Sequence, residues 1–124
     1  MNATDVIDVT LGKSVTSIGD MAFKDFYRLS NIVVPDSIVS IGYDAFYSCS
    51  SLISIDIPNS INLIGANAFS KCNKLSNVII NSNIQQIGQN AFISTSLDLT
   101  LTFASNTYDE VDKMQNAYWG LNRT

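Results

Sequence analysis

Two cysteines are the residues of this 124-residue chain whose chemistry would be most distinctive. Cys49 and Cys72 could form a disulfide with each other or could supply thiolates to a metal site. However, Phe26 and Thr95 stand 23 residues before Cys49 and 23 residues after Cys72, so the same place in the repeat accepts other residue types. We therefore favour the interpretation that both thiols are free, small groups buried in the core.

The composition argues against catalysis and against a bound metal. The chain has no histidine, which removes the commonest general base and the commonest metal ligand. Asp109, Glu110 and Asp112 form an acidic group, but their spacing lacks the glycine-containing loop of calcium motifs. We predict that the protein is not an enzyme and that it needs neither a cofactor nor a metal.

Charge and hydropathy limit the partners. The 11 acidic and 7 basic residues give a net charge of -4, and no basic face is available for nucleic acid. Apolar runs do not exceed three residues, so we expect no membrane insertion. Met1 to Thr10 lacks the features of a signal peptide. The compartment stays open, because the chain could be cytosolic or could lack a targeting region.

The residues above are positioned by a repeat. Gly-x-x-Ala-Phe occurs four times at an interval of 23 residues, at 19–23, 42–46, 65–69 and 88–92. A fixed period of this length predicts a solenoid in which each repeat is one coil of a stack. The glycine is best explained by a positive φ angle or by close approach of the backbones of neighbouring coils.

Aligned columns predict the elements of each coil. Two apolar columns lie two positions apart and are rich in branched side chains: Val9, Ile32, Ile55, Val78 and Leu101, and Leu11, Val34, Ile57, Ile80 and Phe103. They predict short parallel strands with one face buried. A turn at Gly12, Pro35, Pro58 and Asn81 follows, then a bent stretch that leads to the glycine. From Ala-Phe onward we expect a short helical or 3-10 segment.

The two ends of the chain depart from the repeat. We divide a single domain, 1–124, into a partial repeat 1–8, repeats 9–31, 32–54, 55–77 and 78–100, and a final strand and cap 101–124. Thr107 and Glu110 have the spacing of a capping box, which predicts an amphipathic C-terminal helix that ends near Trp119. The first coil is open, so Val6, Val9 and Leu11 are expected to be exposed there.

The pattern of residues 52–72, Leu-x-x-Ile-x-Ile-Pro-x-Ser-Ile-x-x-Ile-Gly-x-x-Ala-Phe-x-x-Cys, resembles the BspA-like leucine-rich repeats. The resemblance covers about residues 6 to 103. It implies an α+β solenoid, that is, a curved right-handed stack with parallel strands on one face, short helical segments on the other and a C-terminal helical cap. It also implies a surface or secreted location and, in several members of the family, adhesion to proteins or cells.

The outward strand face is the first candidate binding surface. Its central positions are Asn31, Val33, Ser54, Asp56, Asn77 and Ile79, which are small, mostly polar residues without an aromatic platform for sugars. Such a surface suits a protein partner better than a glycan. A merely solvated sheet face is the alternative interpretation.

A second candidate interface is an aromatic cluster in the first two repeats, formed by Phe26, Tyr27, Tyr43 and Tyr47. Exposed tyrosines often anchor interfaces, although packing around the open first coil explains them equally well. The sequence thus predicts a non-catalytic protein-binding or adhesion module. The alternative is a structural domain that forms homo-oligomers by pairing through its N-terminal strand edge.

Overall fold

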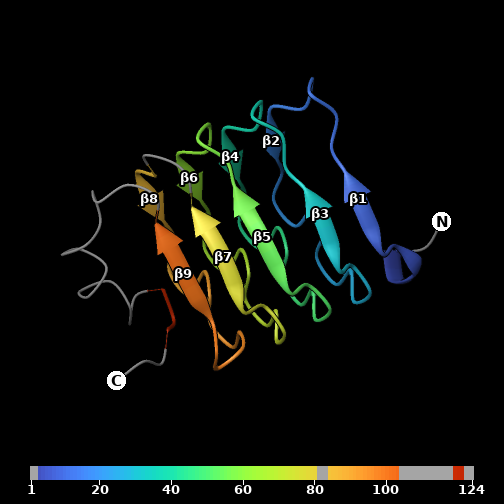
Figure 1. The fold of residues 1–124 in the computed structure, drawn as a ribbon, viewed down its shortest axis with the longest axis vertical. Coiled ribbons are helices and arrows are strands. Elements are labelled where there is room, and N and C mark those ends of the chain that lie inside the picture. Colours follow the sequence, from blue (N-terminus) through green and yellow to red (C-terminus); the bar gives the residue numbers. More distant parts are fainter. Residues whose placement is uncertain (1–2, 81–83, 104–118, 122–124) are drawn as a thin grey trace.

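The computed structural model describes residues 3–80, 84–103 and 119–121. Its main feature is a set of parallel strands stacked at a constant interval. Five of them form the first wall: β1 (Asp8–Thr10), β3 (Asn31–Val33), β5 (Ser54–Ile57), β7 (Asn77–Ile80) and β9 (Thr100–Phe103) (Figure 1). Each lies where the apolar columns predict a strand. Paired residues are 23 apart, as in Ile55 beside Val78, so the period is confirmed as the length of one coil.

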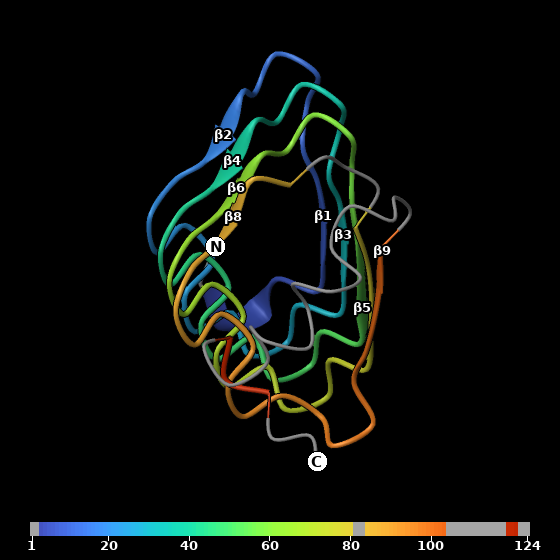
Figure 2. The same ribbon diagram turned by 90° about the vertical axis from the view of Figure 1, so that its left-hand side faces the viewer.

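A second wall lies opposite the first (Figure 2). It is a parallel four-stranded sheet of β2 (Ser17–Ile18), β4 (Ser40–Ile41), β6 (Leu63–Ile64) and β8 (Gln86–Ile87). The sequence predicted an irregular bent stretch here, because its apolar residues are three apart. In the second coil, for example, the turn holds Ile38, whose N–H donates to the carbonyl of Pro35, and the strand holds Ile41. Both side chains are fully buried.

The remaining wall consists of turns, which corrects the expectation of helical segments there. In the described part of the chain the helical residues are those of one 3-10 helix, η1 (Ala3–Asp5). The fold is therefore a β-solenoid of about four coils and not an α+β structure. The N–H groups of Asp44, Phe46 and Ser48 donate to carbonyls of the next coil, at 2.8 to 3.0 Å, whereas a helix would have kept them within its own coil.

In each of four coils, two residues of the turn wall have left-handed backbone angles, with φ between 53° and 64°. They are Met21 and Asp25, Asp44 and Ser48, Asn67 and Lys71, and Asn90 and Ser94. Asparagine and aspartate tolerate this region better than other non-glycine residues, because their short polar side chains hydrogen-bond locally. The column that holds Asp44, Asn67 and Asn90 is therefore a turn signal, although the predicted helical segment took no account of it.

Four phenylalanines form a continuous stack through the core. Phe23, Phe46, Phe69 and Phe92 lie with ring centroids 5.2 to 5.5 Å apart and planes within 10° of parallel. The last three are fully buried, together with the adjacent alanines. Offset stacking of this kind adds to the burial of apolar area that each coil gains from its neighbours.

The repeated glycine is explained by close approach and not by its φ angle. Among the described glycines, Gly120 alone has a positive φ. A β-carbon on Gly88 would collide with the backbone of Ala66 in the preceding coil, whereas a β-carbon on Gly19 would meet nothing within 4 Å. The glycine column thus lets consecutive backbones lie against each other where the second wall meets the turns.

The ends of the stack differ from expectation in part. Val6, Val9 and Leu11 were expected to be exposed, but each is half-buried and packs against the core. At the other end the predicted helical cap lies in residues 104–118, outside the described residues. Trp119 is buried at the end of the described stack. Its carbonyl accepts a hydrogen bond from the N–H of Phe92 at 2.9 Å, just as the Ala91 carbonyl accepts one from the N–H of Phe69 in the preceding coil. The division into repeats stays a prediction.

Candidate binding surface

The strand face is the outward side of β1, β3, β5, β7 and β9. It arises because side chains alternate along a strand, which leaves every second residue exposed, as in the exposed–buried–exposed–buried order of Ser54–Ile57. Register places Ser54 beside Asn77 and Asp56 beside Ile79, while Val33 lies beside Thr10. The six predicted residues therefore lie on one face, all of them exposed except the half-buried Ile79.

The chemistry of the strand face is mildly acidic and partly apolar. Its outward positions hold Asp8, Thr10, Asn31, Val33, Ser54, Asp56, Asn77, Ile79, Thr100 and Thr102, among which there is no basic residue. Val33 is 50% exposed, and Ile53, which immediately precedes β5, is 53% exposed. A surface of this kind can contact an apolar side chain and accept hydrogen bonds or a positive charge.

The predicted aromatic cluster is divided by the fold. Phe26 packs inward, with its ring edge-to-face on Phe23 at 5.2 Å, and is part of the core region. Tyr27 and Tyr43 are about half exposed on the turn side, at 47% and 46%. Tyr47 is half-buried. The three tyrosines thus remain available as surface residues, whereas Phe26 has a packing role.

Two lysines flank Tyr47, an arrangement that was not predicted from the sequence. The Nζ atoms of Lys24 and Lys71 lie 5.3 Å and 5.5 Å from the centroid of its ring. Cation–π contacts of this kind hold the ammonium groups on the turn wall. The repeat indicates part of this arrangement. Lys24 and Tyr47 are 23 residues apart and so occupy the same column in adjacent coils, and Lys71 is one residue past that column in the next coil.

The cysteines lie in the core and are not joined by a disulfide. The thiol of Cys49 donates to the carbonyl of Phe23 at 3.1 Å, and that of Cys72 donates to the carbonyl of Phe46 at 3.0 Å. Both side chains are fully buried. A hydrogen bond with Cys49 and burial raise the pKa of the Cys72 thiol well above its usual value. The Cys72 thiol therefore remains protonated, and both side chains serve the packing of the core.

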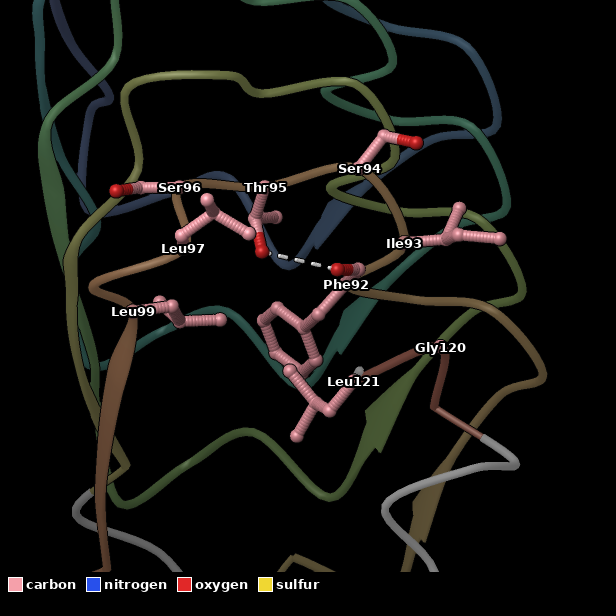
Figure 3. Close-up of a pocket in the computed structure, with 9 residues that line it drawn as sticks. All are labelled: Phe92, Ile93, Ser94, Thr95, Ser96, Leu97, Leu99, Gly120 and Leu121. Carbon is pink, nitrogen blue, oxygen red and sulfur yellow. Dashed lines mark hydrogen bonds between the residues drawn. The ribbon is translucent and has the colours of Figure 1, made fainter. Parts of the chain in front are cut away.

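A cavity of about 240 Å³ opens at the C-terminal end of the described stack. Figure 3 shows its lining, in which Leu121 is directed toward the ring of Phe92. Thr95 donates from its hydroxyl to the Phe92 carbonyl at 3.0 Å, and the side chain of Leu97 is 94% exposed beside the cavity. No sequence pattern indicated this cavity, because Gly120 and Leu121 lie outside the repeat.

A search of the described ranges for grouped metal ligands finds no set of three histidine, cysteine, aspartate or glutamate residues. The acidic group at Asp109, Glu110 and Asp112 lies outside those ranges. None of the helices in the described part of the chain is long and apolar enough to span a membrane.

Comparison with known proteins identifies the repeat. A family model described as a BspA type leucine rich repeat region, in 6 copies, matches residues 1–116. Among solved structures, the chain is similar to a leucine rich cell surface protein of Faecalibacterium prausnitzii, with 36% identity and a TM-score of 0.58. That match covers 64% of this chain and 20% of the other.

The chain is also similar to the leucine rich repeat protein of T. pallidum, with 28% identity, a TM-score of 0.61 and coverage of 81% of this chain and 40% of the other. This chain therefore spans between a fifth and two fifths of the length of these two proteins. No curated protein matches it.

Proposed function

Because this chain belongs to the BspA-type leucine-rich repeat family, we propose that it is a non-catalytic protein-binding or adhesion module that binds through its strand face. The observation that carries the proposal is the row of mostly small outward side chains on β3, β5 and β7, with Val33 half exposed among polar neighbours. Small side chains leave the surface accessible along its whole length, which suits an extended or flat protein partner.

The location that accompanies this function is the cell surface or the extracellular space. It is supported by the similarity to a leucine rich cell surface protein of F. prausnitzii. The family relation also supports a role without catalysis.

Binding to a panel of purified cell-surface and extracellular-matrix proteins tests the function. The immobilised chain is compared with a triple variant of the strand face, Val33→Thr, Asp56→Asn and Ile79→Thr. A matched control carries Val39→Thr and Leu63→Gln, which change exposed apolar residues near or on the second wall. We expect the control to bind like the parent and the triple variant to lose binding. Equal binding by all three proteins would refute the strand face.

A second candidate function is self-assembly through the N-terminal edge. In the described part of the chain β1 pairs only with β3, and the space beside Gly19 is open where Gly42 lies against Asp20 of the preceding coil. A strand with one unpaired edge is a template for another chain. Light scattering over a range of concentrations tests this candidate. A constant monomer mass would eliminate it.

A further inference from the structure

The first wall is interrupted between β3 and β5, although the two strands are neighbours in the stack (Figure 1). β1 pairs with β3, and β5 pairs with β7, which pairs with β9, but within the described residues no ladder joins β3 to β5. The same two coils stay joined elsewhere. β4 pairs with β6 on the second wall, and the turn walls are linked by bonds such as Asp44 N–H to the Ala66 carbonyl.

The repeat identifies the backbone groups that are left unpaired. At the neighbouring junctions Asn31 N–H donates to the carbonyl of Ile7, and Asn77 N–H donates to the carbonyl of Ile53, both at 3.3 Å. The equivalent bond at the interruption would join Ser54 N–H to the Ser30 carbonyl, and no such bond is present among the described residues.

A second bond of the ladder is missing at the same junction. Leu11 N–H donates to the Val33 carbonyl at 3.3 Å, but its counterpart from Val34 N–H to the Asp56 carbonyl is absent from the described residues. Donors and acceptors of two strand edges therefore face each other without pairing. A partner that supplies the missing hydrogen bonds stabilises such polar backbone groups.

The residue that precedes each strand differs between the junctions, but it does not by itself decide the pairing, because Leu99 lacks a hydroxyl where β7 and β9 are paired. The hydroxyls of Ser30 and Ser76 donate to the carbonyls of Ile7 and Ile53, at 3.4 and 3.5 Å, and so link the first coil to the second and the third to the fourth. Ile53 occupies the same column at the junction of the second and third coils. It has no hydroxyl, and its side chain points into solvent with 53% exposure.

The interruption opens into a cavity of about 230 Å³ on the strand face, lined by residues 31–34 and 54–56. We call it the strand slot. Asp56 is the one charged residue in its lining, and the outward columns around it hold no basic residue. The exposed side chain of Val33 forms its apolar rim. The strand slot thus offers the carboxylate and the unpaired carbonyl of Asp56 beside the unpaired N–H groups of Val34 and Ser54.

We propose that the strand slot binds an arginine side chain carried by an extended segment of a protein partner, an inference that rests on the proposed function. A guanidinium has five N–H donors in a planar fork, so it can pair with the Asp56 carboxylate and also donate to the unpaired Asp56 carbonyl. Lysine offers one compact charge and cannot form the same set.

A titration with the capped peptide acetyl-Val-Thr-Arg-Thr-Val-amide, followed by NMR of the isotopically labelled chain, tests the proposal. The control peptide has citrulline in place of arginine, which keeps the shape and removes the charge. We expect amide shifts concentrated at Val34 and Ser54, and binding weaker by about tenfold or more for the control peptide. Equal affinities for the two peptides, or shifts confined to β7 and β9, would overturn the proposal.

Two variants separate the charge from the unpaired backbone. Asp56→Asn should weaken the arginine peptide by about tenfold or more, whereas Asp36→Asn, at an exposed carboxylate outside the strand slot, should leave its affinity unchanged. Ile53→Ser should add a hydroxyl bond to the Ser30 carbonyl, as Ser76 makes to the Ile53 carbonyl, and so weaken peptide binding while the chain stays folded. Unchanged peptide binding in either Asp56→Asn or Ile53→Ser would contradict the proposal.

The proposal and the function on which it rests can fail separately. If the strand-face triple variant loses a protein partner while the peptide never binds the parent chain, the function stands and the arginine site is refuted. If the peptide binds but no protein of the panel is affected by the triple variant, the protein-binding function through this face fails.

Discussion

A β-carbon on Gly65 would lie 2.5 Å from the backbone nitrogen of Tyr43 in the preceding coil. Carbon and nitrogen atoms that are not bonded to each other cannot approach so closely, so any side chain at Gly65 must push two backbones apart. We predict that Gly65→Val lowers the free energy of unfolding by about 2 to 3 kcal/mol or more, which urea denaturation measures. The cause is the close approach, since the φ of Gly65 is not positive.

Gly19 provides the matched control, because a β-carbon there meets no atom within 4 Å. Gly19→Ala should change the free energy of unfolding by less than about 0.5 kcal/mol. If Gly65→Val and Gly19→Ala had the same midpoint of denaturation, close packing of the coils would not be the reason for the glycine column.

Removal of one ring from the phenylalanine stack should destabilise the folded protein. Phe69 is fully buried between Phe46 and Phe92, so Phe69→Ala should destabilise the protein by about 3 to 5 kcal/mol. Phe23 is half-buried at the end of the stack, and the same substitution there should cost less. Thermal unfolding of the two variants compares them directly, and a larger loss at Phe23 would contradict the order.

Met21 should be replaceable with a gain in stability. It has a φ of 58° and is 45% exposed, whereas the equivalent residue of the next three coils is Asp44, Asn67 or Asn90. Met21→Asn should raise the free energy of unfolding by about 0.5 to 1 kcal/mol, because asparagine tolerates the left-handed region better. The reverse change, Asn67→Met, serves as the control and should destabilise. A destabilised Met21→Asn would refute this use of the column.

The buried thiols should resist modification in the folded protein. Alkylation at pH 8 without reductant, followed by mass spectrometry, should add no label to the native chain and two labels after unfolding in urea. A single label, or none after unfolding, would indicate a disulfide or another modification.

The raised pKa of Cys72 also gives a pH dependence. A folded-state pKa above the unfolded value of about 9.0 means that the folded state holds its proton longer. The resulting stabilisation is complete below that unfolded pKa and is lost as the pH rises toward the folded-state pKa. The free energy of unfolding should therefore fall as the pH rises above about 9, and it should fall more steeply in the parent chain than in Cys72→Ala. Parallel pH profiles of the two proteins would contradict this expectation.

The repeat predicted the first wall well because strand burial has a period of two residues and the coil has a period of 23. Ile55 and Val78 can be paired from the sequence alone. The turn wall cannot be derived in this way, because Met21 and Lys71 occupy left-handed positions without belonging to the residue types that signal them. The alternation of side chains predicted which residues point outward from the strands, and the use of that face for binding stays a prediction. Ser54 and Asn31 occupy equivalent columns, so the columns of the strands themselves gave no sign that β3 and β5 are not paired with each other.

The missing ladder between β3 and β5 has a mechanical consequence. In a linear array, cooperativity depends on the coupling between nearest neighbours, and this junction has backbone pairing on two of its three sides only. Tension along the axis should separate the stack there first, into one block with β1 to β4 and another with β5 to β9. An adhesive module built in this way would unfold in two steps under load and would lengthen before it dissociated from its partner.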